Sequence, residues 1–96
     1  MASLLSNEEL DQAFRAVPNW KYDAAAKRLV RATKRQSFLD GIDLVRDIAE
    51  LAEDLQHHPD INIRWTTITF SLTTHSAGGL TLKDFKLAKE IDDLLD

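Results

Sequence analysis

The residues best suited to chemistry in this 96-residue chain are its three histidines. His57 and His58 are adjacent and precede Pro59, whereas His75 follows a run of threonine and serine residues. An imidazole has a reference pKa of about 6.5, so near neutral pH it can either give or take a proton. A cluster of histidines would therefore suit general acid–base catalysis, which is worth roughly 10²–10⁴-fold for each positioned group.

Spacing alone leaves other uses of the histidines open. Adjacent histidines at the end of a helix can hydrogen-bond its last carbonyl groups or simply lie in solvent. A zinc site at His57 and His58 is disfavoured, because neighbouring side chains diverge in an extended segment and no second pair of ligands has metal spacing. The chain has no cysteine, which excludes disulfides, thiolate nucleophiles and cysteine-ligated zinc. We therefore expect no bound metal.

Two helices of the scaffold are predicted from capping boxes, in which a serine or threonine and an acidic residue three positions later close the helix start. The first helix begins at the box of Ser6 and Glu9 and stops at Pro18. The last begins at the box of Thr81 and Asp84, so Asp84 already has a complete structural explanation. The residues of this last helix expected to face inward are Leu82, Phe85, Ala88, Ile91 and Leu95.

A longer amphipathic helix is predicted over residues 39–56, where apolar residues recur three and four positions apart. Pro59 lacks an amide hydrogen and keeps His58 out of the helical region, so the helix should end beside His57. This ending places the paired histidines at a junction between a helix and a strand.

Four strands are predicted from alternating apolar and polar residues, over 19–23, 28–36, 61–65 and 67–75. The second has the thinnest apolar pattern. In the last two, the apolar residues change from odd to even positions near Thr66, which indicates two strands rather than one long strand. The turn between them has no Asn-Gly or other glycine signal, so its geometry is not predicted.

The element order predicts a single α+β domain over residues 1–96: helix, strand, strand, helix, strand, strand, helix. Each pair of strands is close enough to form a hairpin, which gives a four-stranded antiparallel sheet with three helices packed on one face. In the second hairpin, the end of the last strand returns beside the start of its partner. We therefore expect His75, on the polar side of that strand, to lie close to His57 and His58.

Composition excludes several classes of protein. The net charge is −4, so general attraction to nucleic acid is not expected. A local run of five cations is interpreted as the solvated side of a strand, because no aromatic residues alternate with it. Those cations are Lys27, Arg28, Arg31, Lys34 and Arg35. No window reaches the ~18 apolar residues of a membrane span, and the first residues lack a secretion signal, so we expect a cytoplasmic protein.

The stretch from Glu53 to Asp84 resembles the signature of the pterin-4a-carbinolamine dehydratase family. That signature places an acidic residue, a His-His-Pro triplet, an aromatic residue, a histidine and an aspartate at fixed intervals, and every interval is met. The matching residues are Glu53, His57, His58, Pro59, Trp65, His75 and Asp84. The resemblance extends from about Ser6 to Leu95. It is weaker in the second strand, where family members often carry several aromatic residues.

This resemblance implies a hydro-lyase that eliminates water from 4a-hydroxytetrahydropterin, the product of aromatic amino acid hydroxylases, in the recycling of tetrahydrobiopterin. Neither a metal nor an organic cofactor is required for that reaction. His57 and His75 would be the proton-transfer pair, and His58 would orient the substrate and share the work. The residues expected to hydrogen-bond the pterin ring or order the helix start beside it are Thr73, Thr74, Ser76 and Asp84. The residues expected to support the site are Glu53, Pro59 and Trp65.

The resemblance also implies partners. Family members form oligomers, and a chain this short has a small core, so we expect a homodimer or homotetramer. An alternative function is that of a protein-interaction module that stabilises the dimer of a homeodomain transcription factor, as some members do. A relative that has lost its activity is a further alternative, but the complete set of histidines argues against it.

Overall fold

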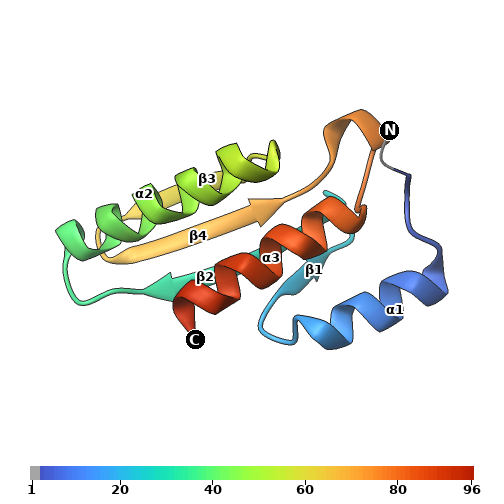
Figure 1. Ribbon diagram of the computed structural model, residues 1–96. Helices are drawn as coiled ribbons and strands as arrows, with labels where there is room; N and C mark the ends of the chain where they lie inside the picture. The colour runs from blue at the N-terminus through green and yellow to red at the C-terminus, as the bar shows by residue number, and fades with distance from the viewer. Residues whose placement is uncertain (1–2) are drawn as a thin grey trace.

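The computed structural model describes residues 3–96 and contains one antiparallel sheet of four strands (Figure 1). The strands are β1 (Lys21–Asp23), β2 (Arg28–Lys34), β3 (Asp60–Arg64) and β4 (Thr67–Leu72). Their spatial order is β1-β2-β4-β3. The last strand, β4, pairs with β3 of its own hairpin and with β2 of the first hairpin, and so joins the two hairpins. The predicted second strand is therefore real, although it ends two residues earlier than predicted.

Three helices cover one face of this sheet, which confirms the predicted α+β class (Figure 1). They are α1 (Asn7–Ala16), α2 (Phe38–Leu55) and α3 (Leu82–Leu95). Both predicted capping boxes are present, because the side chains of Ser6 and Thr81 accept hydrogen bonds in the first turns of α1 and α3 and the acidic partners return them. Within residues 3–96, none of the helices combines the length and the apolar composition of a membrane span.

The core lies between the sheet and the helices. The sheet contributes four side chains that are fully buried, and α2 and α3 add others from the opposite side. The core residues from the sheet are Leu29, Ile68, Phe70 and Leu72, and those from the helices include Ile48, Leu87 and Ile91. Burying each such side chain stabilises the fold by about 1.5–3 kcal/mol. These contacts hold the ends of α2, β4 and α3 in fixed positions, which is what the candidate site requires.

The change of apolar phase near Thr66 is confirmed as a turn between β3 and β4. Ile63 of β3 lies opposite Ile68 of β4, so both stay on the helical face although one number is odd and the other even. Trp65 occupies the turn with a positive φ of 51°, a backbone conformation that is uncommon for a bulky residue. The turn signal was missing from the sequence because no glycine or asparagine takes that conformation here.

Two predicted details are wrong. Leu82 was expected to face inward but is 69% exposed, and Leu87 is buried instead. Leu82 precedes the buried Ala88 by six residues, about 240° around a helix, and therefore points away from the core. The strand predicted over 67–75 ends at Leu72, and His75 lies in a short 3₁₀ helix, His75–Ala77.

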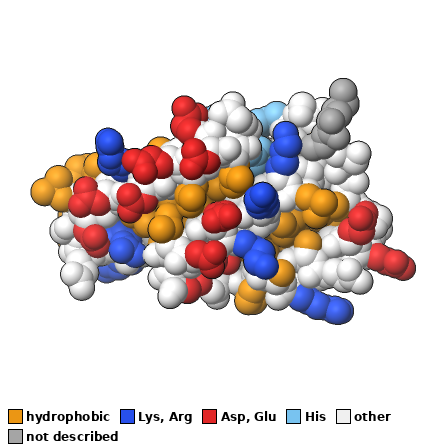
Figure 2. Space-filling model, viewed as in Figure 1, with side chains coloured by type: hydrophobic (Ala, Val, Ile, Leu, Met, Phe, Trp, Pro, Cys, Tyr) orange, Lys and Arg blue, Asp and Glu red, His pale blue; other side chains and the backbone are white. Residues whose placement is uncertain are grey.

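Charge is divided between the two layers. Most acidic residues lie in the helices, whereas most basic residues lie in the strands and the turns beside them. Figure 2 shows acidic side chains gathered over the helices. The helical layer is therefore the more negative side of the molecule, and anions would be attracted to the sheet and its turns.

Candidate active site

His57 is held at the C-terminal end of α2 by a left-handed turn. Gln56 has a positive φ of 51°, and the amide of His57 donates to the carbonyl of Ala52 at 3.0 Å. This geometry directs the imidazole towards α3, where its Nε2 lies 2.6 Å from Oδ1 of Asp84. The side chain of His57 is 11% exposed and that of Asp84 is fully buried. A histidine and a carboxylate that lie 27 residues apart in the sequence thus form a mostly buried pair.

The other oxygen of Asp84 is bound by two further segments. Thr74 donates its hydroxyl to Oδ2 at 2.8 Å, and the amide of Thr81 donates to the same atom at 2.9 Å. The two threonine hydroxyls also lie 2.8 Å apart and share a hydrogen bond. Asp84 therefore caps α3, as predicted, and in addition connects the end of α2 to the segment that follows β4.

This arrangement favours one tautomer of a neutral His57. An ionised carboxylate can only accept hydrogen bonds, so the hydrogen between His57 and Asp84 is assigned to Nε2. Nδ1 then carries a lone pair and can take a proton from a bound molecule. A carboxylate that fixes the tautomer and the orientation of an imidazole in this way is the usual support of a histidine base.

His58 is arranged differently from its neighbour. Its Nε2 lies 2.5 Å from Oε2 of Glu53 in the last turn of α2, and both side chains are exposed. An exposed pair of this kind contributes little to the free energy of unfolding. Glu53 does, however, restrict the orientation of the His58 ring. The role of Glu53 as a support of the site stays a prediction.

His75 follows Thr74 directly and is exposed at the surface. Thr74 is fixed by its hydrogen bond to Asp84 and by a bridge to Gly79, so the 3₁₀ turn that carries His75 is fixed as well. The imidazole lines a hollow of about 220 Å³. Asp84 thus connects the two predicted proton-transfer residues: it contacts His57 directly and holds the residue next to His75.

Other predicted residues lie farther away or are already engaged. Trp65 is 76% exposed at the opposite end of β3 from Pro59, so the structure does not bring it to the histidines. The hydroxyl of Thr73 donates to the carbonyl of Lys27 at 2.8 Å, and Ser76 is exposed in the turn of His75. Pro59 lies between the end of α2 and the start of β3 at Asp60, which agrees with the prediction that it ends the helix.

Sequence reasoning did not assign Thr81 or Lys27 to the site. Thr81 was interpreted as a helix cap alone, and its hydrogen bond with Thr74 becomes visible only when β4 and α3 are packed together. Lys27 was part of the run of cations attributed to a solvated strand. Within residues 3–96, no group of three histidine, aspartate or glutamate side chains is arranged to hold a metal ion.

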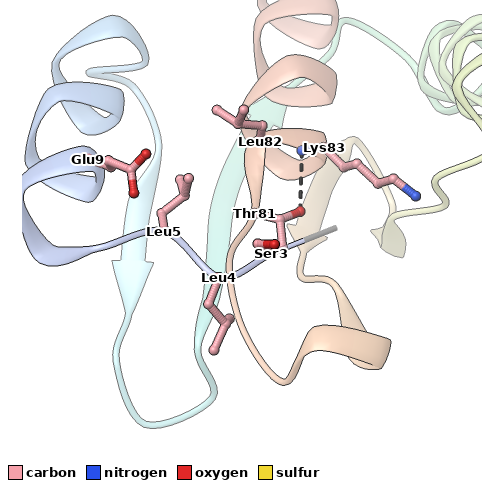
Figure 3. Close-up of a pocket in the computed structure, with 7 residues that line it drawn as sticks. All are labelled: Ser3, Leu4, Leu5, Glu9, Thr81, Leu82 and Lys83. Carbon is pink, nitrogen blue, oxygen red and sulfur yellow. Dashed lines mark hydrogen bonds between the residues drawn. The ribbon is translucent and has the colours of Figure 1, made fainter. Parts of the chain in front are cut away.

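A second hollow, of about 520 Å³, lies between the N-terminal segment, α1 and the first turn of α3 (Figure 3). Leu4, Leu5 and Leu82 give it an apolar lining. Its ionisable residues are Glu9 and Lys83, and Glu9 is already hydrogen-bonded to Ser6 in the capping box. This hollow contains no histidine, so it does not compete as a site for acid–base chemistry.

The fold and these contacts define a class of protein: a small α+β domain whose candidate site combines histidines with one buried carboxylate. The model of the pterin 4 alpha carbinolamine dehydratase family matches residues 3–94. The chain belongs to this family, which confirms the resemblance found in the sequence, and the enzyme class that the family name gives is a hydro-lyase.

Relatives agree with the family assignment. A protein of Mycolicibacterium smegmatis, named as a pterin-4-alpha-carbinolamine dehydratase, is 52% identical over 93 residues, 97% of each chain. A protein of Nocardia farcinica with the same name is 47% identical over 91 residues, 95% of this chain and 94% of its own. A crystal structure from Brucella melitensis, described as a transcriptional coactivator/pterin dehydratase, superimposes with a TM-score of 0.88 at 28% identity and covers 94% of this chain and 96% of its own.

Proposed function

We propose that this protein is a 4a-hydroxytetrahydropterin dehydratase that works by histidine acid–base catalysis in the recycling of tetrahydrobiopterin. The reaction breaks the C4a–OH bond as an acid protonates the departing hydroxyl. A base takes the proton from N5, a C4a–N5 double bond forms, and water and the quinonoid dihydropterin are released. The observation that carries the proposal is the contact between His57 and Asp84 in a chain of this family.

The histidines divide the work in this proposal. His57 and His75 move protons, because the first has an oriented imidazole with Nδ1 free and the second is exposed beside a hollow. His58 orients the substrate. Which of the pair is the acid stays open, because interacting imidazoles titrate as a group. Asp84 acts as a positioning residue through His57.

The test is dehydration of chemically prepared 4a-hydroxytetrahydropterin, followed by stopped-flow absorbance against the uncatalysed background. His57→Ala and His75→Ala should each lower kcat by at least about tenfold, because their contribution arises when a proton moves. Gln12→Ala on the exposed side of α1 is the control and should keep wild-type kcat. Full activity should persist in excess chelator, since no metal is expected. If both histidine variants keep wild-type kcat and melt normally, the proposed mechanism is wrong.

We also propose that the protein acts in the cytoplasm as a homodimer or homotetramer. Three apolar residues at the start of α2 are exposed, and β3 is an edge strand with unpaired backbone groups. The exposed residues are Phe38, Leu39 and Ile42. Light scattering should give at least twice the 10.9 kDa mass of one chain at micromolar concentration. A particle of about 11 kDa would contradict the proposal.

The alternative function, stabilisation of a homeodomain transcription factor dimer, comes from the family resemblance, and its support is the term transcriptional coactivator in the description of the Brucella structure. It predicts that the chain forms a complex with such a dimerisation domain, measured by size-exclusion chromatography of the two purified proteins. The dehydratase proposal requires no such complex.

A further inference from the structure

The hollow beside His75 has a distinctly basic lining. It lies between the β1–β2 turn and the segment that follows β4, and it measures about 220 Å³. The residues that line it are Ala25, Ala26, Lys27, Arg28, Thr73, His75 and Gly78. Whole ligands of drug size occupy about 300–1,000 Å³, so this hollow fits one group of a substrate rather than all of it.

Lys27 is fixed over this hollow by its own backbone. Its φ of 53° directs its carbonyl to the hydroxyl of Thr73, which donates to it at 2.8 Å. The aliphatic stem of Lys27 reaches across to Gly79, because a β-carbon added there would lie 3.9 Å from its Cδ. The side chain of Lys27 is exposed and passes beside Gly79, close to the turn that carries His75.

Arg28 adds a second cation whose charge is only partly paired. Its Nη1 lies 3.5 Å from Oδ2 of Asp60, which is at the limit of a hydrogen bond, and the Asp60 side chain is largely exposed. A guanidinium has five donors, and the buried Nε of Arg28 has no hydrogen-bond partner within residues 3–96. The other nearby carboxylate, Asp23, accepts from the amide of Ala26 within the turn and does not line the hollow.

We propose that the hollow binds an oxyanion, phosphate or carboxylate, carried by the side chain of the pterin substrate. The inference rests on the dehydration proposed above, because it places the pterin ring at His75, but it replaces tetrahydrobiopterin, whose side chain is neutral, with an anionic pterin as the preferred substrate. Lys27 and Arg28 would then pair with the anion while the ring is held for proton transfer. A neutral side chain would gain little from Lys27 and the partly paired Arg28, whereas an anion would be drawn to the basic side of the molecule.

The experiment compares kcat/KM for 4a-hydroxytetrahydropterins with a neutral dihydroxypropyl, a phosphorylated hydroxymethyl or a glutamate-bearing side chain. At low salt, at least one anionic substrate should be preferred over the neutral one by about tenfold. Lys27→Gln removes one cation and should reduce that preference to about threefold or less. The hydrogen bond from Thr73 uses the backbone carbonyl of residue 27, so it survives this change. Asp60→Asn should increase it. Lys34→Gln, the same charge change at the far end of β2, is the matched control and should leave it unaltered.

The outcomes separate the two proposals. Equal turnover of neutral and anionic substrates, with no effect of Lys27→Gln, would overturn the oxyanion site and leave the dehydratase standing. Absence of turnover for all substrates would overturn the dehydratase instead. In that case, calorimetry with the matching 7,8-dihydropterins tests whether the oxyanion site exists. The site requires that an anionic dihydropterin bind more tightly than the neutral one, and that Lys27→Gln remove this gain in affinity. A preference for the phosphate or for the carboxylate identifies the anion.

Discussion

Replacing Asp84 with asparagine tests the centre of the site with almost no change of shape. The carboxylate of Asp84 is fully buried and accepts from three donors: Nε2 of His57 at 2.6 Å, Oγ1 of Thr74 at 2.8 Å and the amide of Thr81 at 2.9 Å. An asparagine has one acceptor oxygen and one donor NH₂ group. In Asp84→Asn, at least one of the three donors therefore faces another donor.

The variant has two ways to resolve this conflict, with different consequences. If the NH₂ group faces Thr74 and Thr81, a buried donor is left unsatisfied, at a cost of about 1–3 kcal/mol in the free energy of unfolding. If it faces His57, the imidazole must move its hydrogen to Nδ1, which leaves the base without its free lone pair. We expect the second outcome to dominate kcat, with a loss of about 10²-fold or more.

Three measurements test this reasoning. Stopped-flow dehydration gives kcat, urea unfolding gives the stability, and ¹⁵N chemical shifts report the tautomer of His57. Asp93→Asn, the same substitution at an exposed position of α3, is the control and should change none of them. If Asp84→Asn keeps kcat within twofold of wild type while its stability falls, then Asp84 is only a helix cap and its role in positioning His57 is refuted.

Two further predictions concern the scaffold. Gly78 follows the turn of His75 with a φ of +76°, so Gly78→Ala should destabilise the protein by about 1 kcal/mol, measured by urea unfolding, and lower kcat by moving His75. The pKa of Asp96 is lowered, chiefly by its hydrogen bond from Arg31. The stability that Asp96 contributes should therefore be present above the ordinary carboxyl range and lost as the pH falls through the lowered value. Wild type and Asp96→Asn should thus differ in urea midpoint at neutral pH and converge in acid; a constant difference would contradict this.

The sequence by itself determined the features that depend on neighbouring residues. Both capping boxes close within four residues, so Ser6 with Glu9 and Thr81 with Asp84 could be identified without any tertiary contact. The helical spacing of α2 and the change of phase near Thr66 also depend only on local order. The family signature contained His57 and Asp84 at their correct interval, although nothing in the sequence showed that they touch.

Only the tertiary structure decided how distant segments meet. β4 pairs with β3 of its own hairpin and with β2 of the other hairpin, so the backbone groups on both of its edges are hydrogen-bonded. The chain leaves the sheet after Leu72 because the hydroxyl of Thr74 is bound to Asp84, which moves His75 from the predicted strand into a turn. Trp65 takes a positive φ because two paired strands must reverse there, whatever residue occupies the position. The contact of His57 with Asp84 arises from packing between α2 and α3, and such a contact has no local signal in the sequence.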